Sequence, residues 1–298
     1  MRRWRLNSGY NATTDQRRTK AGTIPMSKHN MERNLALFGN TLDGWTPEQI
    51  STVFWLDAAT SSTITIATGV STWADRKGGG VNALQATGSL QPSYSATAFP
   101  GSLPGVLFDG TDDILDISTT AMQNQTHGVY WVWSRSGAGT GADTYRASIS
   151  VLASAGQGTN RGALHYVKNS NNFGGCYPYY GGSANNFYDL SSGTVYSNST
   201  GNIMSFQSNT TGWGVWRNGT IESTTNSIAT PNNTNVGYGL GREYSPNRAS
   251  NIVIAEVIMV QVTDTTTRQK IEGYLANKWG LTSSLPADHP YKNSPPAA

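Results

Sequence analysis

The chain has 298 residues, enough for one large domain or two small ones. Charged residues make up only 13% of it, and its 33 glycines, 14 tyrosines and 9 tryptophans exclude a disordered chain and are typical of a β-sandwich or barrel with polar loops. The single cysteine, Cys176, excludes an internal disulfide, and no apolar run is long enough to span a membrane, so no membrane partner is expected.

Basic side chains are concentrated in the first 30 residues. Seven residues there are basic and only Asp15 is acidic, a net charge of +6, whereas the whole chain carries +3. A basic arm suits attachment to an acidic surface, so we predict that residues 1–45 form an anchoring arm with a short linker helix; the alternative is a solvated tail. No nucleic-acid-binding motif accompanies the charges, so a nucleic-acid partner is not expected. The anchoring candidates are Arg2, Arg3, Arg5, Arg17, Arg18 and Lys20.

Short apolar or alternating segments from residue 52 onward predict β-strands. Residues 103–117 predict two strands around a tight turn at Asp109-Gly110, and Asn218-Gly219 predicts the tip of a hairpin. In residues 235–242 a glycine at every second position predicts the close approach of a neighbouring group. Further strands are predicted at 52–57, 62–67, 70–75, 128–135, 148–153, 161–168 and 201–207.

Residues 251–262 form a nearly continuous β-branched and apolar run, which is typical of a strand buried on both faces. One charge, Glu256, lies in its middle. Beyond it, apolar residues recur at helical spacing between Asp264, which can cap a helix, and Gly280, which can end it. The sequence therefore predicts a central strand followed by one short amphipathic helix.

At least ten short strands with hairpin spacing favour an all-β fold, a two-sheet antiparallel β-sandwich. The sandwich is expected to carry one short C-terminal α-helix and an extended N-terminal arm. We divide the chain into the basic arm at 1–45, the sandwich at 46–282 and a Pro-rich C-terminal tail at 283–298.

Four segments carry a resemblance to a known family. They are Trp-Leu-Asp-Ala at 55–58 with Trp-Ala-Asp at 73–75, Val-Leu-Phe-Asp-Gly-Thr-Asp-Asp at 106–113, Trp-Arg-Asn-Gly at 216–219, and the pair formed by 254–258 and 271–281. In this order they resemble the concanavalin A-like, laminin-G-like jelly-roll domain found in bacteriophage virion structural proteins. The resemblance covers roughly residues 46–292. It implies the jelly-roll fold and a place on the phage particle, and it names no function, because this fold hosts lectins, glucanases, adhesins and capsid proteins alike.

Catalytic carboxylates are not recognisable in the sequence. Glycosidases need two facing carboxylates, and glucanases of this fold carry a Glu-x-Asp-x-x-Glu run that is absent here. Glu256 lies between Ile254 and Ile258, which favours a structural carboxylate bonded to loop backbone. The four histidines form no metal-binding pair, and no Gly-x-Ser-x-Gly motif occurs. We therefore expect that the protein is not an enzyme.

Asp109, Asp112 and Asp113 form the richest acidic group, with Asp116 close behind. Oxygen ligands of this kind could bind Ca²⁺, as members of the resembled family sometimes do. The favoured alternative is turn chemistry, in which aspartates accept backbone N–H groups. No other cofactor is expected.

An Asn- and aromatic-rich stretch at 169–202 is the better candidate for a binding surface. Sugar sites combine an aromatic platform with polar groups, but subunit interfaces and packed loops have the same composition, so all three remain open. The candidates are Tyr177, Tyr179, Tyr180, Asn185, Asn186, Phe187 and Tyr188.

From these features we expect a non-enzymatic bacteriophage virion structural protein on the particle surface, of the capsid-decoration or head or tail fibre type. Residues 1–45 would anchor it to the major capsid protein or to other virion proteins, and virion proteins are commonly homo-oligomers. Its loops would contact host surface polysaccharide. The alternatives are a lectin-like carbohydrate-binding module and a polysaccharide-degrading enzyme of the same fold.

Overall fold

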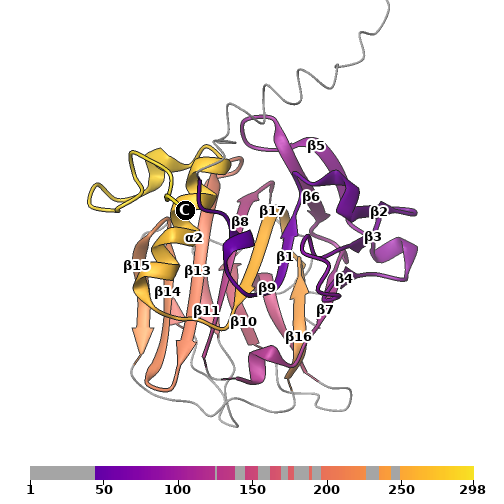
Figure 1. Ribbon diagram of the computed structural model, residues 1–298. Helices are drawn as coiled ribbons and strands as arrows, with labels where there is room; N and C mark the ends of the chain where they lie inside the picture. The colour runs from indigo at the N-terminus through magenta and orange to yellow at the C-terminus, as the bar shows by residue number, and fades with distance from the viewer. Residues whose placement is uncertain are drawn as a thin grey trace, which may run out of the picture.

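Two antiparallel β-sheets packed face to face make up the body of the protein, as Figure 1 shows for the computed structural model. The all-β, two-sheet prediction is therefore confirmed. Ring contacts such as Phe54 to Tyr238, with centroids 6.4 Å apart, join the two sheets through the core. The structure describes residues 44–124, 126–137, 145–153, 162–168, 174–177, 188–189, 196–225, 235–242 and 249–298.

One sheet has eight strands in the order β15-β14-β13-β8-β17-β6-β5, with β1 paired to β17 beside this path. Its strands are β1 (Thr52–Asp57), β5 (Ser93–Phe99), β6 (Leu103–Asp109), β8 (His127–Arg135), β13 (Gly201–Asn209), β14 (Gly212–Arg217), β15 (Thr220–Thr225) and β17 (Asn251–Val260).

The other sheet has nine strands in the order β12-β11-β10-β9-β16-β7-β4-β3-β2. These are β2 (Ile64–Ile66), β3 (Val70–Trp73), β4 (Ala83–Leu84), β7 (Leu115–Ser118), β9 (Tyr145–Ala153), β10 (Gly162–Lys168), β11 (Gly174–Tyr177), β12 (Tyr188–Asp189) and β16 (Asn235–Leu240). Short 3₁₀ turns lie at η1 (Pro47–Gln49), η2 (Ser61–Thr63), η3 (Gly88–Leu90), η4 (Ala121–Gln123) and η6 (Thr282–Ser284).

Strand β17 is central, as its apolar sequence predicts. It pairs with β8 along one edge and with β6 and β1 along the other, and every residue from Ile252 to Val260 is buried. Because both faces of the strand are covered, the run needs no polar alternation.

The predicted turn at Asp109-Gly110 exists, but the two strands around it do not pair with each other. Strand β6 pairs with β17 in the eight-stranded sheet, whereas β7 pairs with β16 and β4 in the other. The chain therefore crosses from one sheet to the other here. A turn motif determines only the local direction of the chain, whereas burial of the whole segment determines which strands pair.

Asn218-Gly219 does form a hairpin tip, between β14 and β15. Both residues have positive φ, 50° and 79°, as the tight turn that suits twisted strands requires. The glycines of β16 meet the predicted close contact: a Cβ on Gly237 would lie 1.8 Å from the carbonyl oxygen of Ile117.

The helix α2 (Thr265–Lys278) begins where predicted. Asp264 caps it by accepting a hydrogen bond from the backbone N–H of Thr267, and Gly280 follows with φ 69°. The expectation of a simple amphipathic helix is wrong, because Arg268 and Glu272 are buried. These two residues face their neighbours: Arg268 stacks on the ring of Trp216 in β14, and Glu272 accepts a hydrogen bond from Ser205 in β13. In Figure 1 the helix lies on the eight-stranded sheet, with the C-terminal segment beside it.

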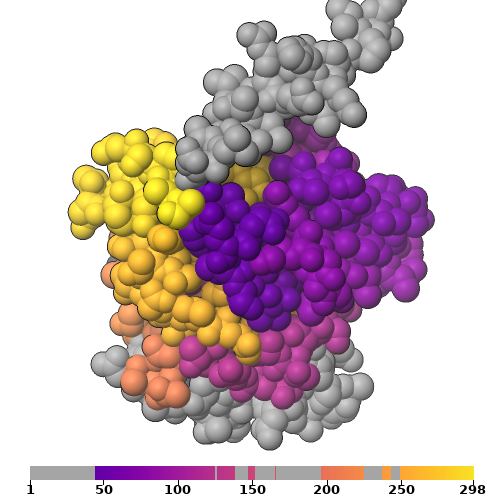
Figure 2. All heavy atoms as spheres, in the orientation of Figure 1, coloured from indigo at the N-terminus to yellow at the C-terminus, as the bar shows by residue number. Residues whose placement is uncertain are grey.

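That C-terminal segment, residues 285–298, is here called the strap. It packs tightly instead of extending away: Tyr291 lies against Gly273, and the ring of His289 lies 3.3 Å from the Glu272 carboxylate. Near its end the strap meets the first described residues, through an N–H of Trp45 donated to Pro296 (2.9 Å). Figure 2 shows these two ends of the described chain in contact.

Candidate functional site

The predicted aromatic surface is described at its two ends only. Strand β11 ends at Tyr177 and strand β12 begins at Tyr188, and the two strands pair at the edge of the nine-stranded sheet. Tyr188 opposes Cys176, so positions 177 and 188 fall on opposite faces of the sheet. Tyr179, Tyr180, Asn185, Asn186 and Phe187 lie outside the described residues.

The strand register places this edge at a definite end of the sandwich. Tyr177 pairs with Ala163 at the start of β10. The neighbouring Gly162 pairs with Val151 near the end of β9, where Ala153 also pairs with the first residue of β16. The strap is at the other end, where Leu285, Pro286 and His289 lie against the turn at Gly219. Tyr177 and the strap therefore lie toward opposite ends of the strands.

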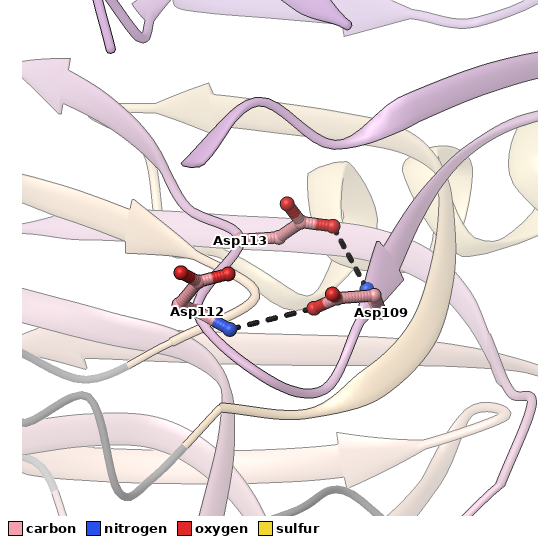
Figure 3. Close-up of side chains that lie close together, drawn as sticks. All are labelled: Asp109, Asp112 and Asp113. Atoms are coloured by element: carbon pink, nitrogen blue, oxygen red, sulfur yellow. Dashed lines mark hydrogen bonds between the residues drawn. The ribbon is translucent and has the colours of Figure 1, made fainter. Parts of the chain in front are cut away.

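The acidic group at the sheet crossing is brought together as predicted, with one carboxylate oxygen from each of Asp109, Asp112 and Asp113 within 4.8 Å of the others. Figure 3 shows how hydrogen bonds hold it. Asp113 accepts from the Asp109 N–H at 2.9 Å, and Asp109 accepts from the N–H of Thr111 at 2.7 Å and of Asp112 at 3.4 Å.

These bonds are the favoured turn chemistry. Burial raises the pKa of Asp113 to about 6, and the neighbouring Asp109 and Asp112 charges add to the rise. No other group of three or more metal-ligating side chains occurs in the part of the chain that the structure describes. The hydrogen bonds account for this cluster without a cation, and Ca²⁺ binding stays a prediction.

A second constellation of ionisable groups lies where the end of α2 meets the central strands, and we call it the helix–sheet cluster: Asp57, Arg76, Glu256, Tyr274 and Lys278. Lys278 Nζ lies 2.7 Å from Asp57 Oδ1 and 2.7 Å from Glu256 Oε2. Glu256 is recognisable in the sequence as a charge within an apolar strand, but its partners are not. Its bonds go to side chains and not to loop backbone as predicted: the indole N–H groups of Trp55 and Trp279 donate to it, each at 2.6 Å.

The pKa values of the two carboxylates in this cluster are shifted in opposite directions. Burial opposes ionisation of Asp57, but the Lys278 and Arg76 charges outweigh it and lower its pKa. Burial raises the pKa of Glu256, with Lys278 opposing and the Asp57 charge adding to the rise. Carboxylates with separated pKa values are what acid–base catalysis uses.

The two carboxylates of this cluster, however, are not accessible to a substrate. Both carboxylate side chains are 0% exposed, and each of their four oxygens already accepts a hydrogen bond. A substrate could reach them only after α2 moved. The cluster therefore fixes the helix to the sheet, in agreement with the structural role predicted for Glu256.

A third polar group lies in the core between the sheets. His165 is fully buried, with Nδ1 2.7 Å from Ser148 Oγ and Nε2 3.1 Å from Tyr196 Oη. Tyr196 Oη in turn lies 3.9 Å from Met204 Sδ. Burial lowers the pKa of His165 to about 3, so the imidazole is neutral. The residues are far apart in the sequence and no motif joins them, so no local pattern marks them as a group.

Three strand tryptophans are buried in the core. Trp131 and Trp133 are fully buried against His165, and Trp213 is 8% exposed. The predicted anchoring residues Arg2, Arg3, Arg5, Arg17, Arg18 and Lys20 lie outside the described residues. Among the described helices, none is long and apolar enough to cross a membrane.

No protein-family model and no curated protein sequence matches this chain. Solved structures do. Trypanosoma rangeli sialidase in complex with the inhibitor DANA matches with a TM-score of 0.53 and 9% identity, over 82% of this chain and 36% of that chain. The same sialidase in complex with 2,3-difluorosialic acid matches with a TM-score of 0.52 and 11% identity, over 76% of this chain and 32% of that one.

Domain 4 of AbnA, a GH43 extracellular arabinanase from Geobacillus stearothermophilus, matches less well, with a TM-score of 0.46 and 10% identity over 70% of this chain and 91% of that one. The chain spans about a third of the length of the sialidase chains it matches. At such low identity the likeness to the sialidases shows a shared fold.

This comparison corrects one expectation. The expectation that the protein is not an enzyme is wrong, because solved structures that share its fold include those of a sialidase. The missing Glu-x-Asp-x-x-Glu run excludes one arrangement of carboxylates and does not exclude enzymatic activity.

Proposed function

We propose that this chain is a carbohydrate-binding β-sandwich whose ligand surface lies at the β11–β12 edge. The observation that carries the proposal is the hairpin pairing that places Tyr177 and Tyr188 on adjacent strands at one end of the sandwich. Between them the sequence is rich in tyrosine and asparagine, the residue types that stack on sugar rings and bond their hydroxyls.

The fold supports the same class of ligand. Structures of the matching sialidase are complexes with sialic acid and with its difluoro derivative. The carboxylates of the helix–sheet cluster are closed to ligands, and α2 packs on the eight-stranded sheet, whereas β11 and β12 form one edge of the other sheet.

A glycan array with the full chain tests the proposal. Sialylated glycans, arabinan fragments and bacterial surface polysaccharides are offered to the wild type and to Tyr177→Ala, Tyr188→Ala and Tyr179→Ala/Tyr180→Ala variants. We expect retention of one glycan class by the wild type and a loss of about tenfold in the Tyr179→Ala/Tyr180→Ala variant and in one of the two single variants, since positions 177 and 188 lie on opposite faces of the sheet edge. An aromatic contact contributes about 0.5–1.5 kcal/mol beyond its buried area. Leu84→Ala, an exposed residue on β4 of the same sheet, is the matched control. Equal retention by all variants would contradict the site.

The array spots are also analysed by mass spectrometry for shortened glycans. Retention without shortening supports a lectin-like module, and shortening supports a glycan-degrading activity of the same surface. No retention and no shortening of any glycan would remove the proposal.

A second candidate function follows from the basic charge of residues 1–30, which is +6 against +3 for the whole chain. In it the protein is held on a virion by residues 1–45, through the major capsid protein or other virion proteins, as a homo-oligomer that presents its β11–β12 edge to host surface polysaccharide. The geometry favours such a display, because the described chain begins beside the strap, at the end away from that edge. A chain lacking residues 1–30 should remain folded and lose attachment to the particle; unchanged incorporation would contradict this function.

A further inference from the structure

The ammonium group of Lys278 occupies a complete binding site within the helix–sheet cluster. Three oxygens surround its nitrogen: Asp57 Oδ1 at 2.7 Å, Glu256 Oε2 at 2.7 Å and Tyr274 Oη at 3.1 Å. A primary ammonium group has three N–H donors, so the three acceptors match its capacity.

Aromatic rings enclose the same nitrogen on its other sides. The ring centroids of Trp279, Tyr274 and Trp55 lie 5.1, 5.4 and 5.9 Å from Nζ. Rings at this distance attract a cation through their quadrupoles, and the attraction grows where water is excluded. The Lys278 side chain is only 16% exposed, and the carboxylates are fully buried.

The carboxylates that form the site also accept hydrogen bonds from groups other than Lys278. Asp57 accepts hydrogen bonds from the Ala59 N–H (3.0 Å), the Thr60 hydroxyl (3.0 Å) and the Arg76 guanidinium. Glu256 accepts from the two indoles of Trp55 and Trp279. The oxygens should therefore keep their positions when the lysine side chain is shortened.

We infer that the fold contains a preformed site for a primary alkylammonium ion, which the chain fills with its own Lys278. Shortening this side chain leaves two buried carboxylates without their shared cation, a strongly unfavourable state that a small external ammonium ion relieves. A quaternary ammonium ion has no N–H group for the three oxygens and is bulkier, so the site should reject it.

Chemical rescue of Lys278→Ala tests the inference. The substitution removes three methylenes and the amine, so n-propylammonium chloride supplies the missing atoms. We expect a lowered unfolding temperature that rises by roughly 3 °C or more once the ion exceeds its dissociation constant about tenfold. Tetramethylammonium chloride at the same concentration should give no such rise, and the wild type and Lys278→Met, whose side chain fills the space without a charge, should respond to neither salt.

A Glu256→Gln substitution added to Lys278→Ala should abolish the rescue, because one of the two carboxylates is lost. If Lys278→Ala does not fold alone, the test is whether n-propylammonium restores its native circular dichroism on refolding. No rescue in either measurement, or the same rise in Lys278→Met or with tetramethylammonium, would overturn the inference.

Discussion

Buried charges in this protein are satisfied by donors drawn from distant parts of the chain. Glu272 accepts from Arg268 at 2.8 Å and from the Ser205 hydroxyl at 2.8 Å, and His289 Nε2 lies 3.3 Å away. Glu256 is bonded in the same way within the helix–sheet cluster. Burying an unpaired charge is costly, so removing one partner should destabilise the fold by more than the loss of a single hydrogen bond would.

Replacing Glu256 by Gln should destabilise the fold strongly. The amide removes the charge that balances Lys278 and turns an N–H group toward a cation, so we expect a loss of about 3 kcal/mol or more in the free energy of unfolding. Urea denaturation measures it. Glu48→Gln is the control: Glu48 is half exposed and 3.8 Å from Arg76, so its loss should stay within about 0.5 kcal/mol. Equal effects of the two substitutions would contradict the role given to Glu256.

Two buried histidines should make the fold sensitive to acid. Burial lowers the pKa of His165 to about 3, and the nearby Arg217 charge lowers it further. Burial also lowers the pKa of His127 to about 4, although its hydrogen bond to the Asn124 carbonyl opposes this shift. Both folded pKa values lie below the unfolded value of about 6.5, so their contribution is complete above pH 6.5 and is lost as the pH falls toward 4.

The unfolding free energy is therefore expected to fall between pH 6.5 and pH 5, by up to about 1.4 kcal/mol per pH unit for each histidine. Thermal unfolding at several pH values measures the slope. His165→Gln should lower stability at pH 7 but make the slope shallower, since one titrating group is gone. A slope unchanged in both His165→Gln and His127→Gln would show that other groups cause the acid sensitivity.

At the scale of elements, the glycines in and just after β16 allow neighbouring groups to approach the backbone closely. At Gly241, just after the strand, φ is 84° and an added Cβ would lie 2.0 Å from the Phe108 ring of the opposite sheet. This close approach lets the end of β16 lie against the core, next to β9, where the Gly241 N–H donates to the Ser148 carbonyl.

Gly241→Ala should therefore cost roughly 3 kcal/mol, from backbone strain together with displacement of the Phe108 ring. Gly78→Ala is the matched control, because Gly78 also has positive φ, 73°, but nothing lies within 4 Å of its Cβ position. Its cost should be about 1 kcal/mol, the backbone term alone. Chemical denaturation of both variants measures the difference, and equal losses would show that crowding by Phe108 does not matter.

At the scale of the whole molecule, the strap joins the two ends of the described chain across α2. It supplies His289 to the Glu272 group, lays Tyr291 on Gly273 and bonds Trp45 through Pro296. The buried polar face of α2 is explained by contacts with both the sheet and the strap: Arg268 stacks on Trp216 of β14, and Glu272 bonds Ser205 of β13 and lies 3.3 Å from His289 of the strap.

Deleting residues 287–298 should therefore lower the unfolding temperature by several degrees, because Glu272 loses a partner and the outer face of α2 is uncovered. Differential scanning calorimetry measures the change. Asp288→Ala, an exposed strap residue, should leave the unfolding temperature nearly unchanged. If the deletion had no more effect than this control, the strap would not contribute to the stability of the fold.

The sequence by itself determined the elements whose signals are local. The apolar run of β17, the Asn218-Gly219 turn and the Asp264 cap are set by neighbours within a few residues, so composition and spacing sufficed for the sandwich. The aromatic composition between Tyr177 and Tyr188 was visible too, and its use on glycans is still a proposal.

Only the tertiary structure decided which elements meet. It put β6 and β7 in different sheets, joined Glu256 to Trp55 across 201 positions, and buried the polar residues Arg268 and Glu272 of α2 against the eight-stranded sheet. The physical reason is that strand partners and the pairing of buried charges depend on which distant surfaces exclude water together, and no local pattern carries that information.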